Sequence, residues 1–377
     1  MSEEDNSLTD KIVYETDASQ IQGHALEVLI PGSIQQLQHQ VRINPKITIR
    51  AAGTSLVGGA VPQNDTVIDL SKLNKILELD ERHKTIVVES GVVLDDLNDF
   101  LEFSDLEFPI NPSSHAVCTI GGMIATDAVG SRAIRYGKTS QWIEWLEIVD
   151  SNGNIHKKEK SELSDFTGLE GITGIISRAC LKLTTKKNRT ASLIAKDKIR
   201  EIIEIAKKEK LNPKVSMLEF LDKTISELLN LPKKYHLLIE YESEKGELKD
   251  EEYKKIIALR DSAYPLLAQA GYSRIEDPKI YLDQFSEVLE WLEKNNIPVF
   301  GHLGVGIIHP CFSKQQESKI PELMKFVRKL RGQVTGEHGI GLTKKQFLDK
   351  TEKDLYLAVK KRNDSLNKFN MNKIIDS

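Results

Sequence analysis

Arg50-Ala-Ala-Gly-Thr-Ser-Leu-Val-Gly-Gly-Ala-Val-Pro62 is a glycine-rich segment that directly follows a short apolar strand candidate at residues 47–49. Because glycine has no Cβ, the backbone of such a segment can come very close to a ligand. Successive backbone N–H groups form an anion-binding nest, and the hydroxyls of Thr54 and Ser55 add donors. This stretch, called the glycine segment below, predicts a site for a cofactor that carries a diphosphate.

Two standard nucleotide-binding motifs do not account for such a site. The glycine spacing of the glycine segment is not G-x-G-x-x-G. Gly137-Lys-Thr139 matches the end of a P-loop, but the first glycine of that motif would occupy position 132, which is Arg132. The diphosphate is therefore expected to bind a different type of loop.

Four further blocks of glycine, histidine and acidic residues follow along the chain. The first block consists of residues 111–114 and 119–125 together with Gly130, Tyr136 and Gly137. The other three blocks are residues 168–176, 301–309 and 336–341. In this order, and together with the glycine segment, the blocks resemble the FAD-linked oxidases, the flavoproteins with the fold of vanillyl-alcohol oxidase. The resemblance is to the glycolate oxidase FAD subunit, D-lactate dehydrogenase and D-2-hydroxyglutarate dehydrogenase branch, in a compact version, from about residue 14 to the C-terminus.

The resemblance implies an α+β protein, with a two-subdomain FAD-binding domain and an α/β substrate (cap) domain. A length of 377 residues also favours two domains, and the composition turns basic and polar at residues 182–189. We expect the FAD-binding domain at residues 1–187 and the substrate domain at 188–326. Residues 327–377 would carry the Glu-His-Gly loop and pack back on the flavin side.

Apolar periodicity predicts alternating strands and helices. Strands are expected at residues 25–30, 67–70, 85–89, 143–149, 237–241 and 298–300. Helices are expected from Ser33 onward and at residues 94–103, 199–210, 221–229, 247–269 and 281–295. Residues 151–154 carry a hairpin turn signal.

The bulk composition predicts an ordinary soluble surface. Charged residues make up 29% of the chain and the net charge is −4, so no basic excess favours nucleic acid. Residues 1–5 are acidic and polar, unlike a signal peptide, and no apolar run approaches the roughly 18 residues of a membrane span. We expect a cytoplasmic protein, and peripheral attachment to a membrane stays open.

The cysteines limit the route by which electrons leave. Cys118, Cys180 and Cys311 are scattered and odd in number, which favours a reducing compartment. No Cys-x-x-Cys pair exists, so the chain is not expected to hold its own iron–sulfur cluster. The electron acceptor would be separate: an iron–sulfur subunit, an electron-transfer flavoprotein, a quinone or oxygen.

Two histidines in the block at 301–309 are candidate metal ligands. His302 and His309 would diverge in an unbroken strand, but Gly304 and Gly306 allow a turn that brings both imidazoles to one side. Neutral imidazoles suit Zn²⁺, with Mn or Fe as alternatives, and the carboxylate of Glu337 would complete the set. Two structural histidines without a metal remain the alternative.

His338 directly follows Glu337 in a glycine-flanked loop. The resemblance implies that Glu337 ligates the metal and that His338 is the general base. A metal lowers the pKa of a bound substrate hydroxyl, and a histidine with a pKa near ~6.5 takes its proton near neutral pH. The Cα hydrogen would then pass to the flavin as hydride. A tight turn with an exposed histidine is the alternative.

A 2-hydroxy acid also needs a cation for its carboxylate. The resemblance implies this role for Arg260 and a second cation at Arg274, because the guanidinium fork matches a carboxylate. An exposed helix arginine is the alternative for each. Tyr264, one helical turn beyond Arg260, lines the same pocket or belongs to the core.

The chain departs from the family pattern at three positions. Val305 and Ile307 replace the Asp and Asn of Gly-His-x-Gly-Asp-Gly-Asn-x-His, and Asp127 stands where relatives have Asn. An apolar pair removes polar support that normally orients metal ligands. The consequence would be a less polar substrate, weak metal binding or loss of the standard activity. Cys311 could compensate as a soft ligand or be a buried structural thiol.

For the flavin, the resemblance implies a contact set spread over the first half of the chain. Backbone groups of residues 52–55 would hold the pyrophosphate, Ser113 and residues 119–122 would lie near the ring and ribityl chain, and residues 170–176 would edge the adenosine half. The full expected set is Arg50, Ala51, Ala52, Gly53, Thr54, Ser55, Gly58, Gly59, Ser113, Thr119, Gly121, Gly122, Tyr136, Glu170, Gly171, Gly174 and Ile176. His115 and Cys118 also raise covalent attachment of the flavin.

These features together predict FAD-dependent oxidation of a D-2-hydroxy acid to the 2-oxo acid, assisted by a divalent metal and His338. One alternative is a metal-free oxidase of a sugar, lactone or alcohol on the same fold. Another is a non-catalytic FAD-binding subunit, suggested by Val305 and Ile307.

Overall fold

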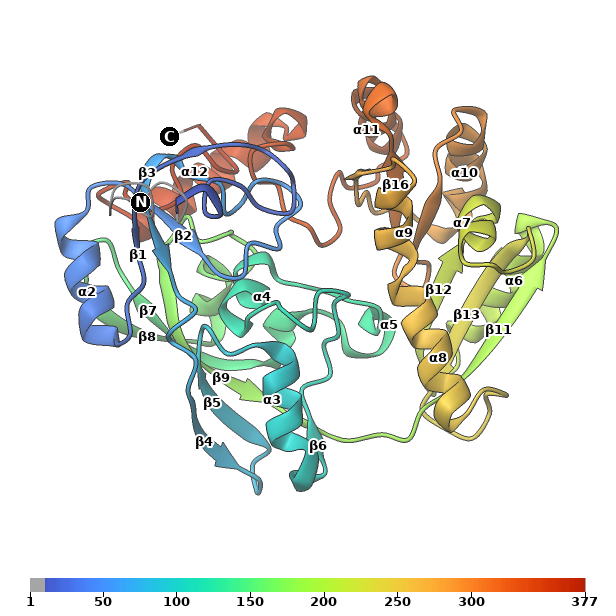
Figure 1. Cartoon of the computed structure of the whole chain (residues 1–377), viewed down its shortest axis with the longest axis horizontal. Coiled ribbons are helices and arrows are strands. Elements are labelled where there is room, and N and C mark those ends of the chain that lie inside the picture. Colours follow the sequence, from blue (N-terminus) through green and yellow to red (C-terminus); the bar gives the residue numbers. More distant parts are fainter. Residues whose placement is uncertain (1–10, 377) are drawn as a thin grey trace, which may run out of the picture.

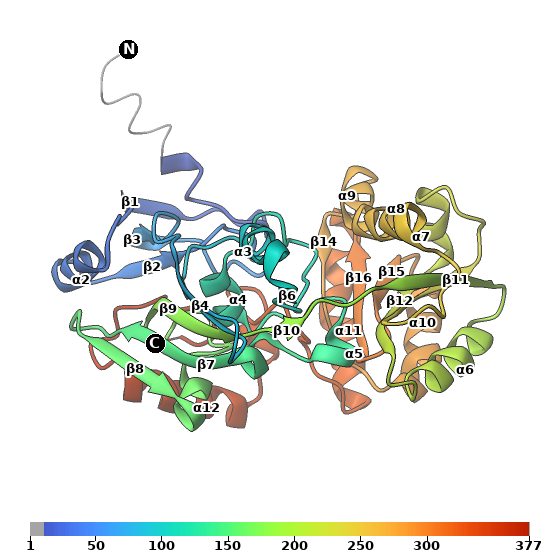
Figure 2. The ribbon, with the colours of Figure 1, turned by 90° about the horizontal axis from the view of Figure 1, so that it is seen from below.

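The computed structural model describes residues 11–376, which form two lobes (Figures 1 and 2). The first lobe contains a three-stranded and a five-stranded sheet, and the second contains a six-stranded sheet with helices on both faces. The mixture of helices and mostly antiparallel sheets confirms the expected α+β class.

A parallel three-stranded sheet positions the glycine segment. Its strands are β1 (His24–Leu29), β3 (Gln63–Asp69) and β2 (Ile47–Arg50), in that order. Helix α2 (Ile34–Ile43) begins where the Ser33 side chain accepts a hydrogen bond from the backbone N–H of Gln36, and it buries Leu37 and Val41 against the sheet. The glycine segment is the crossover between β2 and β3.

The second sheet of this lobe is antiparallel throughout. It has the order β4 (Ile76–Asp80), β5 (Thr85–Glu89), β9 (Ile175–Lys182), β7 (Ile143–Val149), β8 (Ile155–Glu159), and the β7–β8 hairpin confirms the turn expected at residues 151–154. Helices α3 (Leu94–Phe100) and α4 (Ile120–Thr126) contribute apolar side chains to its core. A small ribbon pairs β6 (Leu106–Glu107) with β10 (Thr184–Thr185).

The second lobe is built on the sheet β11 (Thr190–Lys196), β13 (Tyr235–Tyr241), β12 (Val215–Leu221), β15 (Val299–His302), β16 (Ile307–Phe312), β14 (Arg274–Ile275). Helices α6 (Ile199–Glu209), α10 (Phe285–Lys294) and α11 (Ile320–Lys329) share one apolar cluster with one face of the sheet. Helices α7 (Lys223–Leu228), α8 (Asp250–Asp261) and α9 (Ala263–Gln269) pack on the other.

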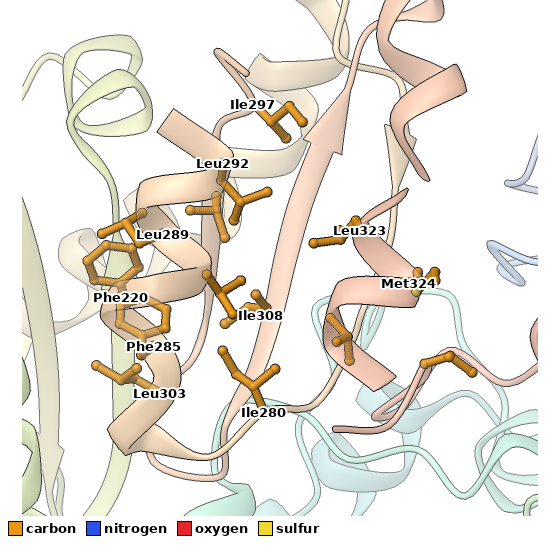
Figure 3. Packing of buried hydrophobic residues seen from close by; sticks show 14 of the residues in the cluster. Phe220, Ile280, Phe285, Leu289, Leu292, Ile297, Leu303, Ile308, Leu323 and Met324 are labelled. Carbon is orange, nitrogen blue, oxygen red and sulfur yellow. The ribbon is translucent and has the colours of Figure 1, made fainter. Parts of the chain in front are cut away.

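Figure 3 shows the larger of these clusters, where helix α10 and strand β12 meet. The rings of Phe220 and Phe285 lie edge to face with centroids 4.9 Å apart, and both side chains are fully buried. Leu289, Leu292 and Ile308 surround them. Removing a buried ring of this kind costs about 3–5 kcal/mol, so this cluster holds the sheet that carries β15 and β16 in place.

Two helix predictions in this lobe were wrong in their bounds. The helix expected at residues 221–229 starts later, because Leu221 ends β12 and the Asp222 side chain caps α7 by accepting from the Ile225 N–H. The helix expected at residues 247–269 divides into α8 and α9 at Ser262. Pro265 explains the break, since its ring would clash with a carbonyl one turn earlier in a continuous helix.

The C-terminal segment lies against the first lobe. After α12 (Lys350–Asn363), Phe369 pairs with Ile47 of β2 and is completely buried. The Asn370 side chain accepts a hydrogen bond from the N–H of Ile49 and donates one to the carbonyl of Glu170. These contacts connect the end of the chain with the strand that precedes the glycine segment.

The remaining regular elements are short. Helix α5 (Ala133–Tyr136) contacts β12 across the two lobes. The 3-10 helices are η1 (Leu101–Ser104), η2 (Thr139–Trp142), η3 (Lys160–Asp165), η4 (Leu282–Gln284), η5 (Lys314–Lys319) and η6 (Lys345–Phe347). Within residues 11–376, no helix combines the length and the apolar character that crossing a membrane requires.

Candidate active site

A cavity of about 540 Å³ lies where the two lobes meet. Its wall includes Gly53–Ser55 of the glycine segment, the loop before α4, and residues 170–176 from the first lobe. The second lobe contributes Arg260, and His302 and His309 from its β15–β16 hairpin. The cavity therefore brings together regions more than 200 residues apart in sequence.

The glycine segment has an internally organised backbone. Ser55 Oγ accepts hydrogen bonds from the N–H groups of Val57 (3.3 Å) and Gly59 (2.9 Å), and its own O–H is left to donate. Gly53 has φ +69°, and a Cβ there would collide with the Arg50 guanidinium. Glycine suits that position because a side chain would be strained in the left-handed conformation, and the Arg50 guanidinium would have to move to make room for it.

Most of the expected flavin contacts line this cavity, and four do not. Those on the wall are Ala51, Gly53, Thr54, Ser55, Gly59, Ser113, Thr119, Gly121, Gly122, Glu170, Gly171, Gly174 and Ile176. Those off the wall are Arg50, Ala52, Gly58 and Tyr136.

Three of the four residues off the wall have partners elsewhere in the structure. The Arg50 guanidinium donates to the carbonyls of Val13 and Thr16, so it fastens the preceding segment. Gly58 packs against Leu342. The Tyr136 hydroxyl donates to the Glu242 carboxylate.

The cavity fits a flavin dinucleotide in size and in lining. Its volume lies in the range of about 300–1,000 Å³ that is usual for cofactor sites. Ile49, Leu70 and Met123 form apolar walls, and the buried Ser90 Oγ on the wall has no hydrogen-bond partner among the described residues. An unpartnered hydroxyl in a roomy apolar cavity favours a ligand that supplies the missing hydrogen bond.

Glu170 connects the flavin side with the Glu-His-Gly loop at residues 336–341. Its buried carboxylate accepts hydrogen bonds from the backbone N–H groups of Ile340 (2.6 Å) and Gly341 (3.0 Å). Burial raises the pKa of Glu170, and the two N–H groups oppose that rise. The carboxylate that the resemblance assigned to the adenosine half thus also holds residues 336–341 in place.

Covalent attachment of the flavin receives no support from the two candidate side chains. Burial raises the pKa of the Cys118 thiol to about 11, so its nucleophilic thiolate is scarce near neutral pH. His115 Nδ1 lies 2.8 Å from the Asp95 carboxylate.

The two histidines of the β15–β16 hairpin converge. Phe300 pairs with His309 and His302 pairs with Ile307, which puts both imidazoles on the same face of the hairpin. Gly306 has φ +77° in the connecting turn, as the sequence predicted for a turn at this point. His302 Nε2 lies 3.3 Å and His309 Nε2 lies 3.1 Å from Glu337 Oε1.

These three side chains could hold a divalent ion. One potential ligand atom from each lies within 4.8 Å of the others. Two imidazoles and a carboxylate suit Zn²⁺ and similar ions. Burial lowers the pKa of His302, but the carboxylates of Glu219 and Glu337 outweigh burial and raise it to about 10. The two carboxylates therefore attract positive charge to this imidazole, and a bound cation would take the place of the extra proton.

Glu219, which the sequence reasoning missed, orients His302. Its Oε1 accepts a hydrogen bond from His302 Nδ1 at 2.6 Å, so the Nε2 atom of His302 faces Glu337. Its Oε2 accepts from Nε and NH2 of Arg260 at 2.9 and 2.6 Å. The signal was a single charge in the otherwise apolar strand β12, VSMLEFL.

Asp277, which was also missed, holds the Glu-His-Gly loop. Its Oδ2 accepts hydrogen bonds from the backbone N–H groups of Gly336, Glu337 and His338 at 2.7–2.9 Å. Burial opposes ionisation of Asp277, but the ammonium of Lys344 and the N–H donors lower the pKa to about 2. The buried carboxylate is therefore a permanent anion behind His338.

His338 lies next to the metal-ligand cluster, the group of candidate ligands His302, His309 and Glu337. Its ring stacks on His309 with centroids 5.1 Å apart, and its Nε2 lies 3.6 Å from Glu337 Oε1. Burial lowers the pKa of His338 to about 4, which Asp277 opposes. The imidazole is neutral at pH 7 and can accept a proton.

The two predicted arginines have different positions. Arg260, in the last turn of α8, lines the cavity and is buried against Glu219 and Asp261. Arg274 is not on the wall, and its Nε and NH2 both donate to Glu276 Oε1. A buried carboxylate thus holds the Arg274 guanidinium off the cavity wall, whereas Arg260 lines the cavity although it is also ion-paired.

The departures from the family pattern lie behind the cavity wall. Ile307 is 1% exposed and packs with Val129 and Val305. A Cβ on Gly336 would come within 2.6 Å of Ile307, so this side chain supports the Glu-His-Gly loop by packing. Cys311 Sγ donates to the carbonyl of His309 rather than facing the cluster. The Asp127 carboxylate accepts from the Ser140 N–H.

Comparison with known proteins agrees with this geometry. The family model described as "FAD binding domain" matches residues 25–158, and "FAD linked oxidases, C-terminal domain" matches residues 248–374. The glycolate oxidase subunit GlcD of Bacillus subtilis (strain 168) is 28% identical over 415 residues, covering 92% of this chain and 87% of its own. The D-2-hydroxyglutarate dehydrogenase of Stutzerimonas stutzeri (strain A1501) is 26% identical, covering 85% and 84%.

A yeast relative has similar coverage. The D-2-hydroxyglutarate–pyruvate transhydrogenase DLD3 of Saccharomyces cerevisiae is 26% identical over 94% of this chain and 86% of its own. The first family model lies within the first lobe, and the second covers part of the second lobe together with the C-terminal segment that packs on the first. The chain therefore belongs to the FAD-linked oxidases and is an FAD-dependent oxidoreductase.

Proposed function

We propose that this protein oxidises a D-2-hydroxy acid to the 2-oxo acid, with a bound divalent metal ion and His338 activating the hydroxyl. One observation carries the proposal: His302, His309, Glu337, His338 and Arg260 all line the cavity that the glycine segment also lines. The relatives named for glycolate oxidation and D-2-hydroxyglutarate dehydrogenation support a hydroxy-acid substrate.

FAD and a divalent metal ion would supply two kinds of chemistry at this site. FAD, when bound, takes up the two electrons and the hydrogen of the substrate Cα–H bond. A divalent ion, when bound, lowers the pKa of the substrate hydroxyl. His302 Nε2, His309 Nε2 and a Glu337 carboxylate oxygen would hold the ion, since these atoms converge and Glu219 engages Nδ1 of His302.

His338 is the proposed general base. Its Nε2 atom lies on the same side as the Nε2 atoms that surround Glu337, so it faces the place where the hydroxyl would be bound. It is neutral at pH 7 because burial lowers its pKa. After it accepts the proton, the permanent anion Asp277, 3.7 Å from Nδ1, stabilises the imidazolium.

Arg260 is the proposed anchor for the substrate carboxylate. Its guanidinium is buried and directed into the cavity wall by Glu219 and Asp261, so its remaining N–H groups have a fixed orientation. Fixed charged donors bind a carboxylate with little loss of side-chain entropy. This contact would set which side of the substrate faces His338.

Residues 188–326 would act as the substrate domain, and the preceding and following segments would hold the flavin. The electrons would leave through a separate acceptor: an iron–sulfur subunit, an electron-transfer flavoprotein, a quinone or oxygen. We place the reaction in the cytoplasm because Cys118, Cys180 and Cys311 are free thiols in the structure.

The test is anaerobic reduction of the protein-bound flavin by a panel of D- and L-2-hydroxy acids, followed by its visible absorbance. We expect bleaching by a D-acid that is lost on metal removal and in His338→Asn. His156→Asn, a change of a half-exposed histidine on β8, is the matched control and should bleach normally.

Other outcomes would point elsewhere. Bleaching by polyols in metal-free protein would replace the proposal with a metal-free sugar or alcohol oxidase. A flavin that no alcohol reduces would favour the non-catalytic subunit.

A further inference from the structure

We infer that the substrate is a 2-hydroxy monocarboxylic acid with an apolar side chain, and that the site rejects 2-hydroxy dicarboxylic acids. This inference rests on the proposed function and names the substrate class of the same cavity. It follows from the charges and the apolar side chains around Arg260.

The cavity offers few cations. Among the wall residues within the described part of the chain, Arg260 is the single lysine or arginine. Two nearby cations are directed elsewhere, since Arg274 donates to Glu276 and Lys344 lies between Glu276 and Asp277. Apart from the histidines of the proposed metal site, a second carboxylate on the substrate would therefore find no cationic side chain of its own.

Arg260 itself has room for one carboxylate. A guanidinium has five N–H donors. Three hydrogen bonds are already made, two to Glu219 Oε2 and one to Asp261 Oδ1. Five minus three leaves two donors, which matches one carboxylate bound through two hydrogen bonds.

The neighbour of Arg260 adds a negative charge to the wall. Asp261 lines the cavity, and its side chain is 25% exposed although it accepts a hydrogen bond from Arg260 NH1. A second substrate carboxylate near this position would be repelled. A neutral substrate side chain would not.

An apolar surface lies next to the anchor and the metal-ligand cluster. It consists of Leu56, Tyr264, Ile275 and Phe300, which line the cavity and belong to one apolar cluster. The Phe300 ring lies 4.9 Å from the His309 ring, and Tyr264 lies four residues beyond Arg260, at the start of α9. The Tyr264 hydroxyl donates to the carbonyl of Ser273, so it is already engaged.

This arrangement determines which substituent the cavity accepts. A hydrocarbon side chain placed on the apolar surface leaves water favourably. A carboxylate placed there is desolvated without a partner, a penalty large enough to reduce specificity by about 100-fold or more. The geometry therefore favours the apolar member of any pair of substrates with equal shape.

The experiment compares two pairs of D-acids. Within each pair, one acid ends in a carboxylate and the other ends in an isopropyl group of similar shape. The first pair is D-malate and D-2-hydroxy-4-methylpentanoate, and the second is D-2-hydroxyglutarate and D-2-hydroxy-5-methylhexanoate. We expect kcat/KM for the apolar acid to exceed that for the dicarboxylate by about 100-fold or more. Equal values, or a preference for the dicarboxylate, would overturn the inference and leave the proposed function intact.

Failure of the proposed function gives a different result. If none of these acids reduces the flavin, both the hydroxy-acid reaction and the substrate class are wrong. A binding measurement separates specificity from turnover: the oxidised protein is titrated with 2-oxo-5-methylhexanoate and 2-oxoglutarate while the flavin spectrum is followed. We expect Kd to be about 100-fold lower for the apolar oxo acid, and similar affinities would contradict the inference.

A variant tests the apolar surface directly. Tyr264→Lys places a cation on the same cavity wall as Arg260, at a half-buried position, and should raise kcat/KM for D-2-hydroxyglutarate relative to its apolar partner by at least about tenfold. Tyr281→Lys changes an exposed tyrosine away from the cavity wall and should leave the ratio unchanged. A folded, flavin-containing Tyr264→Lys protein with the wild-type ratio would contradict the role given to the apolar surface. If the variant does not fold, the comparison of the two substrate pairs with the wild-type protein decides the inference.

Discussion

Glu219 Oε1 accepts a hydrogen bond from Nδ1 of His302 at 2.6 Å, and both side chains are at most 5% exposed. The two residues lie on neighbouring strands β12 and β15, in directly paired positions. The pair fixes which imidazole nitrogen faces Glu337, and the second oxygen of Glu219 holds Arg260. One buried carboxylate thus positions a metal-ligand candidate and the proposed substrate anchor together.

Glu219→Gln should weaken metal binding. The amide keeps the shape but loses the charge that supports His302 and Arg260, and loss of such a partner typically lowers metal affinity by about 10–100-fold. The measurement is the Kd for Zn²⁺ by competition with a chelator, which does not depend on turnover.

Glu227→Gln, an exposed glutamate paired with Lys233, is the matched control for this change. It should leave the Kd for Zn²⁺ at the wild-type value. A Glu219→Gln protein with unchanged metal affinity would show that the carboxylate does not position His302.

His338→Asn should lower kcat by about 10²–10⁴-fold, the usual contribution of a general base. The FAD and metal contents of the purified protein should stay the same, since Glu337 and both metal-ligand histidines are retained. Stopped-flow flavin reduction, with cofactor and metal analysis of the same sample, measures all three. A parallel loss of metal would assign His338 a ligand role instead.

Gly53→Ala should reduce flavin binding. Its φ of +69° and the adjacent Arg50 guanidinium oppose any side chain, at a cost of at least about 1 kcal/mol. The measurement is the FAD content after purification and the Kd for FAD. Gly271→Ala is the control, because Gly271 also has a positive φ, +93°, but open space around it. This change should strain the backbone and leave FAD binding normal.

Lys373 should make stability depend on pH. It is fully buried and donates to Thr48 and Asn370. Its charged neighbours are Asp17, Asp65, Glu170 and Arg50. Burial lowers the pKa of Lys373 to about 7 from its ordinary value of 10.5, although the acidic neighbours oppose the shift.

The sign of this effect follows from the lowered pKa. The folded state prefers the neutral amine, so the contribution of Lys373 to the free energy of unfolding is fully present above about pH 10 and is lost as the pH falls through about 7. Urea unfolding from pH 6 to 10 should show wild type gaining stability relative to Lys373→Met as the pH rises. Lys72→Met, at an exposed position, should show no such change, and parallel curves for the first pair would contradict the assignment.

Local patterns predicted much of the fold and part of the site. The strand at residues 143–149 and its hairpin were confirmed because alternation and turn residues act over a few positions. The turn between His302 and His309 followed from Gly304 and Gly306, since glycine allows backbone conformations that other residues avoid. The family was confirmed because its blocks depend on short runs of glycine and histidine.

Local patterns could not predict hydrogen-bond partners that lie far apart in the sequence. Glu219 lies 83 residues before His302, and Asp277 lies 60 residues before Glu337, so no spacing rule connects them. Arg274 had the right charge for a substrate anchor, but Glu276, two residues away, engages it. Arg260 and Arg274 look alike in the sequence, because only the packed chain determines which of them lines the cavity.

The sequence by itself determined the cofactor class, the α+β fold and the chemical types of the site residues, because each depends on local backbone freedom and side-chain chemistry. The tertiary structure alone decided how these residues are used. It placed Arg50 and Tyr136 away from the cavity, put Asp277 behind His338, and set an apolar surface beside Arg260. The reason is physical: burial and the choice of partner depend on which distant segments pack together, and that packing fixes the charge balance of the cavity.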